Sequence, residues 1–208
     1  MSRLLSVVDV TVDIGSERVL DGFSLDVAAG TMLAVTGASG SGKTSLMWTI
    51  AGLLTPVAGE IRLGGERLRG RDAAVAAGVS LVPQGNALAS VLTARENTIV
   101  SLVASGLSAN VAAARTDLAL DELGVAAQAD QLAEELSGGQ RQRVAIARAL
   151  ARRGTVFLGD EITSNLDSSN RDRVVKLLRD RADNGMIVVL TTHDDDTIAA
   201  CDARVHLG

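Results

Sequence analysis

Between Gly37 and Thr44 the chain alternates glycine with small side chains and then reaches Lys43, directly after the apolar run 32–36. The apolar run predicts a buried parallel strand, and residues 43–54 predict a helix. Glycines let backbone N–H groups curl around phosphate oxygens where a Cβ would collide. A strand, a glycine-rich loop and a helix in this order therefore predict an α/β core that binds phosphate at one edge of its sheet.

Three further apolar runs are typical of buried strands, and a polar residue follows each of them: Gln84, Asp160 and His193. In open α/β sheets, ligands bind beyond the carboxyl ends of the strands. We therefore expect these three side chains to converge with Gly37 on one edge of one sheet.

The first third of the chain favours antiparallel strands. Residues 8–14 alternate apolar and polar side chains with a period of two. A turn is expected at 15–18, and extended structure is expected on both sides of Asp21 and Gly22, a pair typical of turns. The Ala- and Leu-rich stretch 88–132 instead has helical spacing and predicts an inserted helical region.

Two later helices complete the prediction, one capped by Ser137 and one over 168–183. The predicted fold class is α/β: a P-loop NTPase core with a mostly parallel sheet, an antiparallel β part at the N-terminus and an inserted α-helical sub-domain. We expect one domain, 1–208, with a catalytic core formed by 1–84 and 137–208 and a helical sub-domain at about 85–136.

Composition excludes some classes of partner and location. Lys and Arg total 20 against 25 Asp and Glu, and the net charge of −5 argues against nucleic acid as a partner. Cys201 is the single cysteine of the 208 residues, which is typical of a reducing compartment. The N-terminus does not resemble a signal peptide, and no stretch approaches the ~20 apolar residues needed to span a bilayer.

Four residues carry the chemistry predicted at the sheet edge. Lys43 brings positive charge to the outer phosphates, and the Thr44 hydroxyl suits Mg2+. Asp160 can hold the same ion from the opposite side, and Glu161 is placed to orient and deprotonate an attacking water. The alternative for the two acids is a helix N-cap followed by a first-turn carboxylate, which the preceding apolar strand disfavours.

A second motif, Leu136-Ser-Gly-Gly-Gln140, gives a specific resemblance. It resembles the signature motif of ATP-binding cassette (ABC) ATPases, and the resemblance covers nearly the whole chain in the family's order. The matching segments are 37–44 (Walker A), Gln84 (Q-loop), Asp160 and Glu161 (Walker B and catalytic glutamate), 164–167 (D-loop) and His193 (switch histidine).

The resemblance implies two copies paired head to tail, with ATP between Lys43 of one copy and the signature motif of the other. Gln84 would touch Mg2+, and His193 would contact the γ-phosphate. Outside this context, Gln84 reads as a loop glutamine and Ser137 as a simple N-cap. The expected catalytic residues are Lys43, Glu161 and His193; the expected nucleotide-binding residues are Gly37, Ala38, Ser39, Gly40, Ser41, Gly42, Lys43, Thr44, Ser45, Gln84, Ser137, Gly138, Gly139 and Gln140; the expected Mg2+ ligands are Thr44, Gln84 and Asp160.

The chain departs from the family's pattern at three positions. Ile14 stands where many cassettes have an aromatic residue that stacks on adenine, an interaction worth ~1–3 kcal/mol in nucleic-acid complexes. We expect Ile14→Tyr to tighten ATP binding. Ile162 replaces the usual proline and Gly159 the common alanine, and we expect both changes to matter little.

The signature region looks most like the MacB, lipoprotein-release and FtsE group, with bacterial heme and peptide exporters nearby. The resemblance implies an ATPase, peripheral at the cytoplasmic face of the membrane, that drives a separate permease docked around 84–97. Export is favoured over import because the chain ends at Gly208, soon after His193. An FtsE-like ATPase that signals in cell division stays open. A chromosome-type ATPase is rejected, because about 90 residues between Lys43 and Ser137 leave no room for a long coiled coil.

Overall fold

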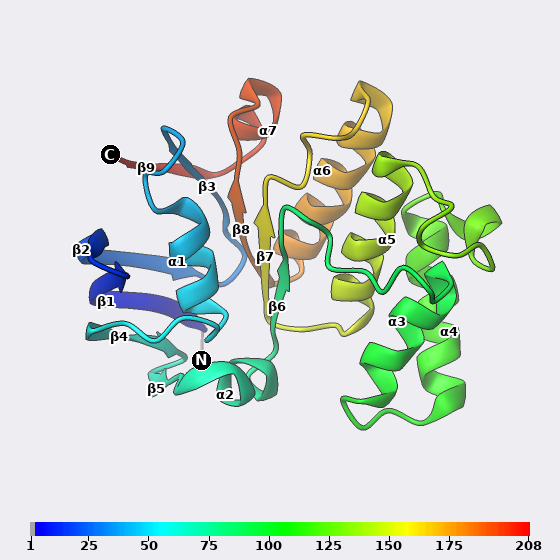
Figure 1. The fold of residues 1–208 in the computed structure, drawn as a ribbon, viewed down its shortest axis with the longest axis horizontal. Coiled ribbons are helices and arrows are strands. Elements are labelled where there is room, and N and C mark those ends of the chain that lie inside the picture. The colour runs from blue at the N-terminus through cyan, green and yellow to red at the C-terminus, as the bar shows by residue number, and fades with distance from the viewer. Residues whose placement is uncertain (1–2) are drawn as a thin grey trace.

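A computed structural model describes residues 3–208 of the chain as two sheets and a layer of helices (Figure 1). The first sheet is antiparallel, in the order β2 (Glu17–Ala28), β1 (Leu4–Ile14), β4 (Ala58–Leu63) and β5 (Glu66–Arg67). The second is parallel, in the order β6 (Val79–Val82), β7 (Val156–Asp160), β8 (Ile187–Thr191), β3 (Met32–Gly37) and β9 (Ala203–Leu207). Both the parallel core and the antiparallel part at the N-terminus match the sequence prediction.

Helices cover both sides of the parallel sheet. Helix α1 (Lys43–Ile50) lies between the two sheets, whereas α5 (Gly138–Ala151) and α6 (Ser168–Asp183) pack on the opposite face (Figure 1). The others are α2 (Gly70–Ala76), α3 (Ala94–Val103), α4 (Ala109–Glu122), α7 (Asp195–Ala199) and a 3-10 turn at Ala126–Gln128. Helices α3 and α4 pack against α5 and form the outer part of the helical layer.

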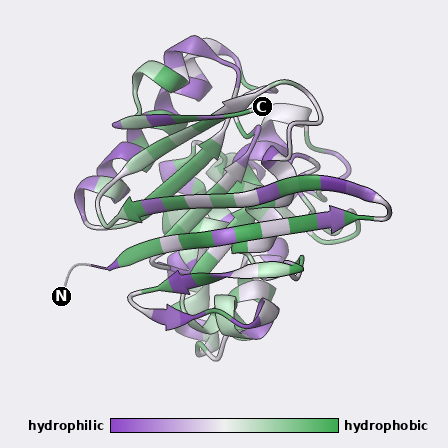
Figure 2. Cartoon of the chain, turned by 90° about the vertical axis from the view of Figure 1, so that its left-hand side faces the viewer, coloured by the Kyte–Doolittle hydropathy of each residue, from purple (hydrophilic) through white to green (hydrophobic). Residues whose placement is uncertain are grey.

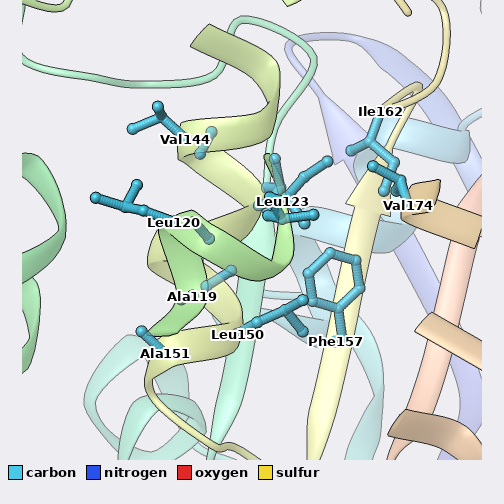
Figure 3. Packing of buried hydrophobic residues seen from close by; sticks show 14 of the residues in the cluster. Ala119, Leu120, Leu123, Val144, Leu150, Ala151, Phe157, Ile162 and Val174 are labelled. Atoms are coloured by element: carbon cyan, nitrogen blue, oxygen red, sulfur yellow. The ribbon is translucent and has the colours of Figure 1, made fainter. Parts of the chain in front are cut away.

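Side chains that alternate between the two faces of the central strands divide the apolar core into two clusters. Phe157 of β7 faces the helices α4, α5 and α6 (Figure 3), and its neighbour Leu158 faces α1 and the antiparallel sheet. Successive side chains of a strand point to opposite faces, so each central strand of the sheet contributes to both clusters. The long strands of the antiparallel sheet instead alternate hydrophilic and hydrophobic residues (Figure 2), because only one face is covered.

The structure confirms several predicted elements and corrects others. Ser137 caps α5, and α6 spans 168–183 as expected. The predicted turn at Asp21 and Gly22 is wrong, because β2 runs through it. Val10 pairs with Phe23 and Val12 with Leu20, so β2 carries an extra residue there, and the positive φ of 56° at Gly22 accommodates this bulge. Strands β4, β5 and β9 and helices α2 and α7 were not predicted.

Within residues 3–208, no helix is long and apolar enough to cross a membrane. The helical region predicted at 85–136 contains α3, α4 and the 3-10 turn, with loops around them. Its status as a separate sub-domain stays a prediction.

Candidate functional site

The loop between β3 and α1 forms a tight cradle, and two of its positions have room only for glycine. A Cβ on Gly37 would lie 2.2 Å from the Leu207 carbonyl oxygen and 2.4 Å from Ser41 Oγ. A Cβ on Gly42, whose φ is 91°, would lie 2.5 Å from the Val19 carbonyl oxygen. At these two positions the loop therefore packs tightly against the backbone of neighbouring strands. It presents the N-terminal end of α1 to an anion.

The Lys43 ammonium lies across the mouth of this loop. Its Nζ donates hydrogen bonds to the carbonyl oxygens of Gly37 and Ala38, each at 2.8 Å. These two acceptors hold the cation next to the cradle. Charge and geometry together suit the outer phosphates of a nucleoside triphosphate.

A buried carboxylate faces the loop from the end of β7. Asp160 is 2 % exposed, and its Oδ2 accepts a hydrogen bond of 2.9 Å from the Thr44 hydroxyl. Its Oδ1 accepts a 2.5 Å hydrogen bond from the Thr191 hydroxyl. Sequence analysis missed Thr191, although its place at the end of an apolar strand was a signal.

The oxygens of Thr44 and Asp160 suit Mg2+. Mg2+ prefers oxygen ligands such as hydroxyls and carboxylates, and the structure brings Thr44 Oγ1 and Asp160 Oδ2 to within 2.9 Å of each other. Gln84, exposed in the loop after β6, lines the same cleft and offers a third oxygen.

Glu161 has a backbone conformation unusual for a residue with a Cβ. Its φ is 53°, and its N–H donates to the Thr191 carbonyl at 3.2 Å and to the Thr191 hydroxyl at 3.0 Å. The carboxylate is 14 % exposed, and its Oε2 lies 3.0 Å from Nδ1 of His193, whose side chain is 78 % exposed. Strain of this kind concentrates at functional sites, and here it points an acid into the cleft.

These groups share one cleft of about 630 Å³. The predicted residues that line it are Gly37, Ser39, Gly40, Gly42, Lys43, Thr44, Ser45, Gln84, Asp160, Glu161 and His193. Ile14, Glu17 and Val19 complete the lining. The structure therefore brings the phosphate loop and the polar residues after β6, β7 and β8 to one sheet edge, as the sequence predicted.

The signature motif does not line this cleft. Ser137 and Gln140 form a capping box, in which the Ser137 N–H donates to Gln140 Oε1 at 2.8 Å and the Gln140 N–H donates to Ser137 Oγ at 3.3 Å. The N–H groups of Gly138 and Gly139, in the first turn of α5, have no intrahelical acceptor and can receive an anion from outside.

Two departures from the family's pattern turn out to be coupled. A Cβ on Gly159 would lie 2.8 Å from Cδ1 of Ile162 and 2.8 Å from Cδ2 of Leu190. Both neighbours are buried, with Ile162 1 % exposed and Leu190 not exposed at all. The larger side chain at 162 thus occupies space that an alanine at 159 would need.

We expect Gly159→Ala to destabilise the protein by about 1–3 kcal/mol, because it overpacks this contact. Adding Ile162→Ala to Gly159→Ala should recover part of that loss, although Ile162→Ala alone leaves a cavity. Urea unfolding of the two single variants and the double variant measures the coupling. If the changes in the free energy of unfolding of the two single variants add up to that of the double variant, the assigned contact is contradicted.

The family model for ABC transporters matches residues 20–164. The chain belongs to the ABC transporter ATP-binding family. It is 38% identical to the lipoprotein-releasing system ATP-binding protein LolD of Geobacter metallireducens, over 99% of each chain. It is 36% identical to the macrolide export ATP-binding/permease protein MacB of Shigella sonnei, over all of this chain but 33% of that one. These relatives fit the predicted group.

Solved structures agree with the family. The ABC cassette matches MJ0796, solved as a dimer in a post-hydrolysis state bound to ADP and Pi, with a TM-score of 0.90 and 28% identity. That match covers 98% of this chain and 94% of the other. The fold is therefore that of an ABC ATPase, and the chain is an ATP-binding and ATP-hydrolysing cassette.

Proposed function

We propose that this ABC cassette is the ATPase subunit of a bacterial exporter and closes head to tail on ATP to drive a separate permease. One observation carries the proposal: the cleft of a single chain contains the phosphate loop, Asp160, Glu161 and His193 but lacks the signature motif. An active site completed by Ser137 of a second copy accounts for this separation. The dimeric state of MJ0796 supports the arrangement.

In the proposed cycle each residue has a defined role. The N–H groups of 38–44 and the Lys43 ammonium bind the β- and γ-phosphates. Thr44, Asp160 and Gln84 hold Mg2+, which neutralises phosphate charge when bound. The Glu161 carboxylate accepts a proton from the attacking water, and His193 contacts the γ-phosphate.

The second copy supplies the remaining contacts. Ser137 and the free N–H groups of Gly138 and Gly139 cap the γ-phosphate from the facing chain. Hydrolysis removes the group that bridges the two chains, so the dimer opens. Closing and opening in turn move the permease.

We assign permease docking to a groove of about 480 Å³ beside the loop that carries Gln84. Leu53, Leu92 and the half-exposed Val100 contribute apolar surface, whereas Arg71, Arg148 and Arg152 contribute charge. No carboxylate lines this groove among the described residues. Burial lowers the pKa of Arg71, and the positive charge of Arg152 lowers it further, so an acidic partner segment fits.

Arg148 connects this groove to the nucleotide cleft. Its guanidinium donates to the Asn86 carbonyl at 2.9 Å and also to the Ala87 carbonyl, and so ties α5 to the loop that begins at Gln84. Helix α5 begins at the signature motif. A partner in the groove therefore contacts a segment that touches both halves of the proposed composite site.

We expect Val100→Asp to reduce recovery of the permease at least about tenfold, because it places a carboxylate on the apolar wall of the groove. Val111→Asp, at an exposed valine of α4 outside the groove, is the matched control and should leave recovery unchanged. The measurement is co-purification of each tagged chain from its native membranes in mild detergent, followed by mass spectrometry. Equal recovery with both variants would contradict this docking surface.

The identity of the captured protein also tests the transport assignment. A polytopic protein with large extracytoplasmic loops supports the exporter, as the likeness to LolD and MacB suggests. Capture of a division-site protein favours the FtsE-like alternative. Either result supports the peripheral position on the cytoplasmic face of the membrane that we propose.

A further inference from the structure

Arginines gather at the edge of the parallel sheet opposite the nucleotide cleft. A hollow of about 350 Å³ lies before β7 and β8, and Arg3, Arg115 and Arg153 line it. A second hollow of about 950 Å³ adjoins the first, since Arg3 and Arg153 line both, and Arg152 lines it as well. We call Arg3, Arg115, Arg152 and Arg153 the basic band.

The charges of the basic band are not neutralised within the chain. The arginines that form ion pairs within residues 3–208 all lie outside the band: Arg18, Arg62, Arg67, Arg95, Arg171, Arg179 and Arg181. Two carboxylates line the hollows among the described residues, and one of them, Glu122, is held by Arg181 at 2.6 Å. Only Glu66 remains to balance four arginines, on a chain whose net charge is −5.

Interaction with helix dipoles does not account for the whole basic band. Arg152 is the C-cap of α5, where a cation stabilises the free carbonyl groups of the helix end. Arg115 instead lies in the middle of α4, and Arg3 precedes β1. The four arginines therefore share a surface rather than a helix end.

Exposed leucines accompany these arginines. Leu4 is 39 % exposed and lines the second hollow, whereas Leu118 is 47 % exposed and lines the first. Arginine next to exposed leucine is typical of surfaces that lie at the boundary between the headgroups and the acyl chains of a bilayer. This combination favours a lipid surface over an acidic protein as the partner.

The basic band borders the groove that we assign to the permease. Val75 and Arg152 line both that groove and the second hollow. A permease is embedded in the bilayer, so a cassette that docks through this groove holds the band close to the membrane surface. Anionic phospholipids of the cytoplasmic leaflet attract arginines at that distance, and guanidinium groups bind phosphate oxygens well.

We propose that the basic band binds the headgroups of anionic phospholipids directly, in addition to the contact that the cassette makes through its permease. This inference rests on the proposed function, because the permease groove determines which face of the cassette meets the bilayer. Four guanidinium groups spread over two hollows suit several headgroup phosphates rather than one small ligand. Each arginine close to an anionic surface strengthens binding about fivefold.

The test measures co-sedimentation of the full chain with phosphatidylcholine vesicles that contain about a third phosphatidylglycerol. We expect binding to these vesicles and not to pure phosphatidylcholine, and we expect about 0.5 M salt to abolish it by screening. Arg115→Gln combined with Arg153→Gln should weaken binding at least about tenfold. The matched control, Arg62→Gln combined with Arg173→Gln, removes the same charge from exposed residues outside both hollows and should bind as the wild type does.

Other readouts separate this inference from the proposed function. Val100→Asp should lose the permease but keep vesicle binding, whereas the Arg115 and Arg153 double variant should keep ATP hydrolysis and recovery of the permease in detergent. Arg115→Lys combined with Arg153→Lys keeps the charge and should keep vesicle binding.

Equal vesicle binding by the two glutamine double variants would overturn the inference and leave the transporter assignment intact. Binding of the wild-type chain to pure phosphatidylcholine, or no binding to either kind of vesicle, would do the same without any variant. Release from the vesicles by inorganic phosphate at constant ionic strength would also overturn it, because the band would then take a small free anion. Absence of ATP hydrolysis in the wild-type chain would instead contradict the proposed function.

Discussion

Replacing Glu161 with glutamine is expected to lower ATP turnover by at least ~100-fold while ATP still binds. Glutamine keeps the size and shape of the side chain but cannot accept the proton of the attacking water. The cradle at 37–44, Lys43 and the Thr44–Asp160 pair are untouched by this change, so affinity should persist. Bound ATP is then not consumed, and the closed dimer should accumulate.

Phosphate release under saturating ATP measures the turnover, and size-exclusion chromatography with ATP and Mg2+ measures the dimer. Glu134→Gln is the matched control, because Glu134 is exposed and lies outside the cleft. The control should hydrolyse ATP as the wild type does and should not accumulate as a dimer. Near-normal hydrolysis by Glu161→Gln would remove Glu161 from the catalytic role.

The sequence predicted the residues that line the cleft better than it predicted the residues that hold them in place. Gly37 and Asp160 end two parallel strands, Gln84 and His193 follow two others, and the carboxyl ends of parallel strands lie at a single edge. Thr191 was not predicted as a site residue, because its contact with Asp160 depends on β7 pairing with β8 in one register. A single sequence does not reveal which of its strands are neighbours.

Local signals failed where tertiary contacts decided the outcome. Asp21 and Gly22 form a typical turn pair, yet pairing with β1 on both sides keeps β2 continuous and reduces the glycine to a bulge. Likewise, Gly159 and Ile162 each departed from the family's pattern without an evident reason. Their contact in the core explains both, since one gives up the volume that the other fills.

The proposed composite site leads to a prediction that can be tested only by mixing two different variants of the chain. Lys43→Ala removes the cation from the phosphate loop and should weaken ATP binding at least about tenfold. Ser137→Arg should still bind ATP but should not hydrolyse it, because a bulky cation replaces the cap on the facing chain. Each variant alone therefore forms dimers in which both sites carry a defect.

Mixing the two variants should restore activity. In a mixed dimer, one site contains both substitutions, and the other combines an intact Lys43 with an intact Ser137. Half of randomly paired dimers are mixed and each has one intact site of two, so about a quarter of wild-type turnover is expected if sites act independently.

Lys43→Ala mixed with the doubly substituted chain is the matched control, since none of its dimers contains an intact site. If the first mixture is no more active than this control, Ser137 acts within its own chain and the head-to-tail arrangement is wrong. Recovery confined to the first mixture requires Ser137 to act across the interface, as its absence from the cleft of its own chain implies.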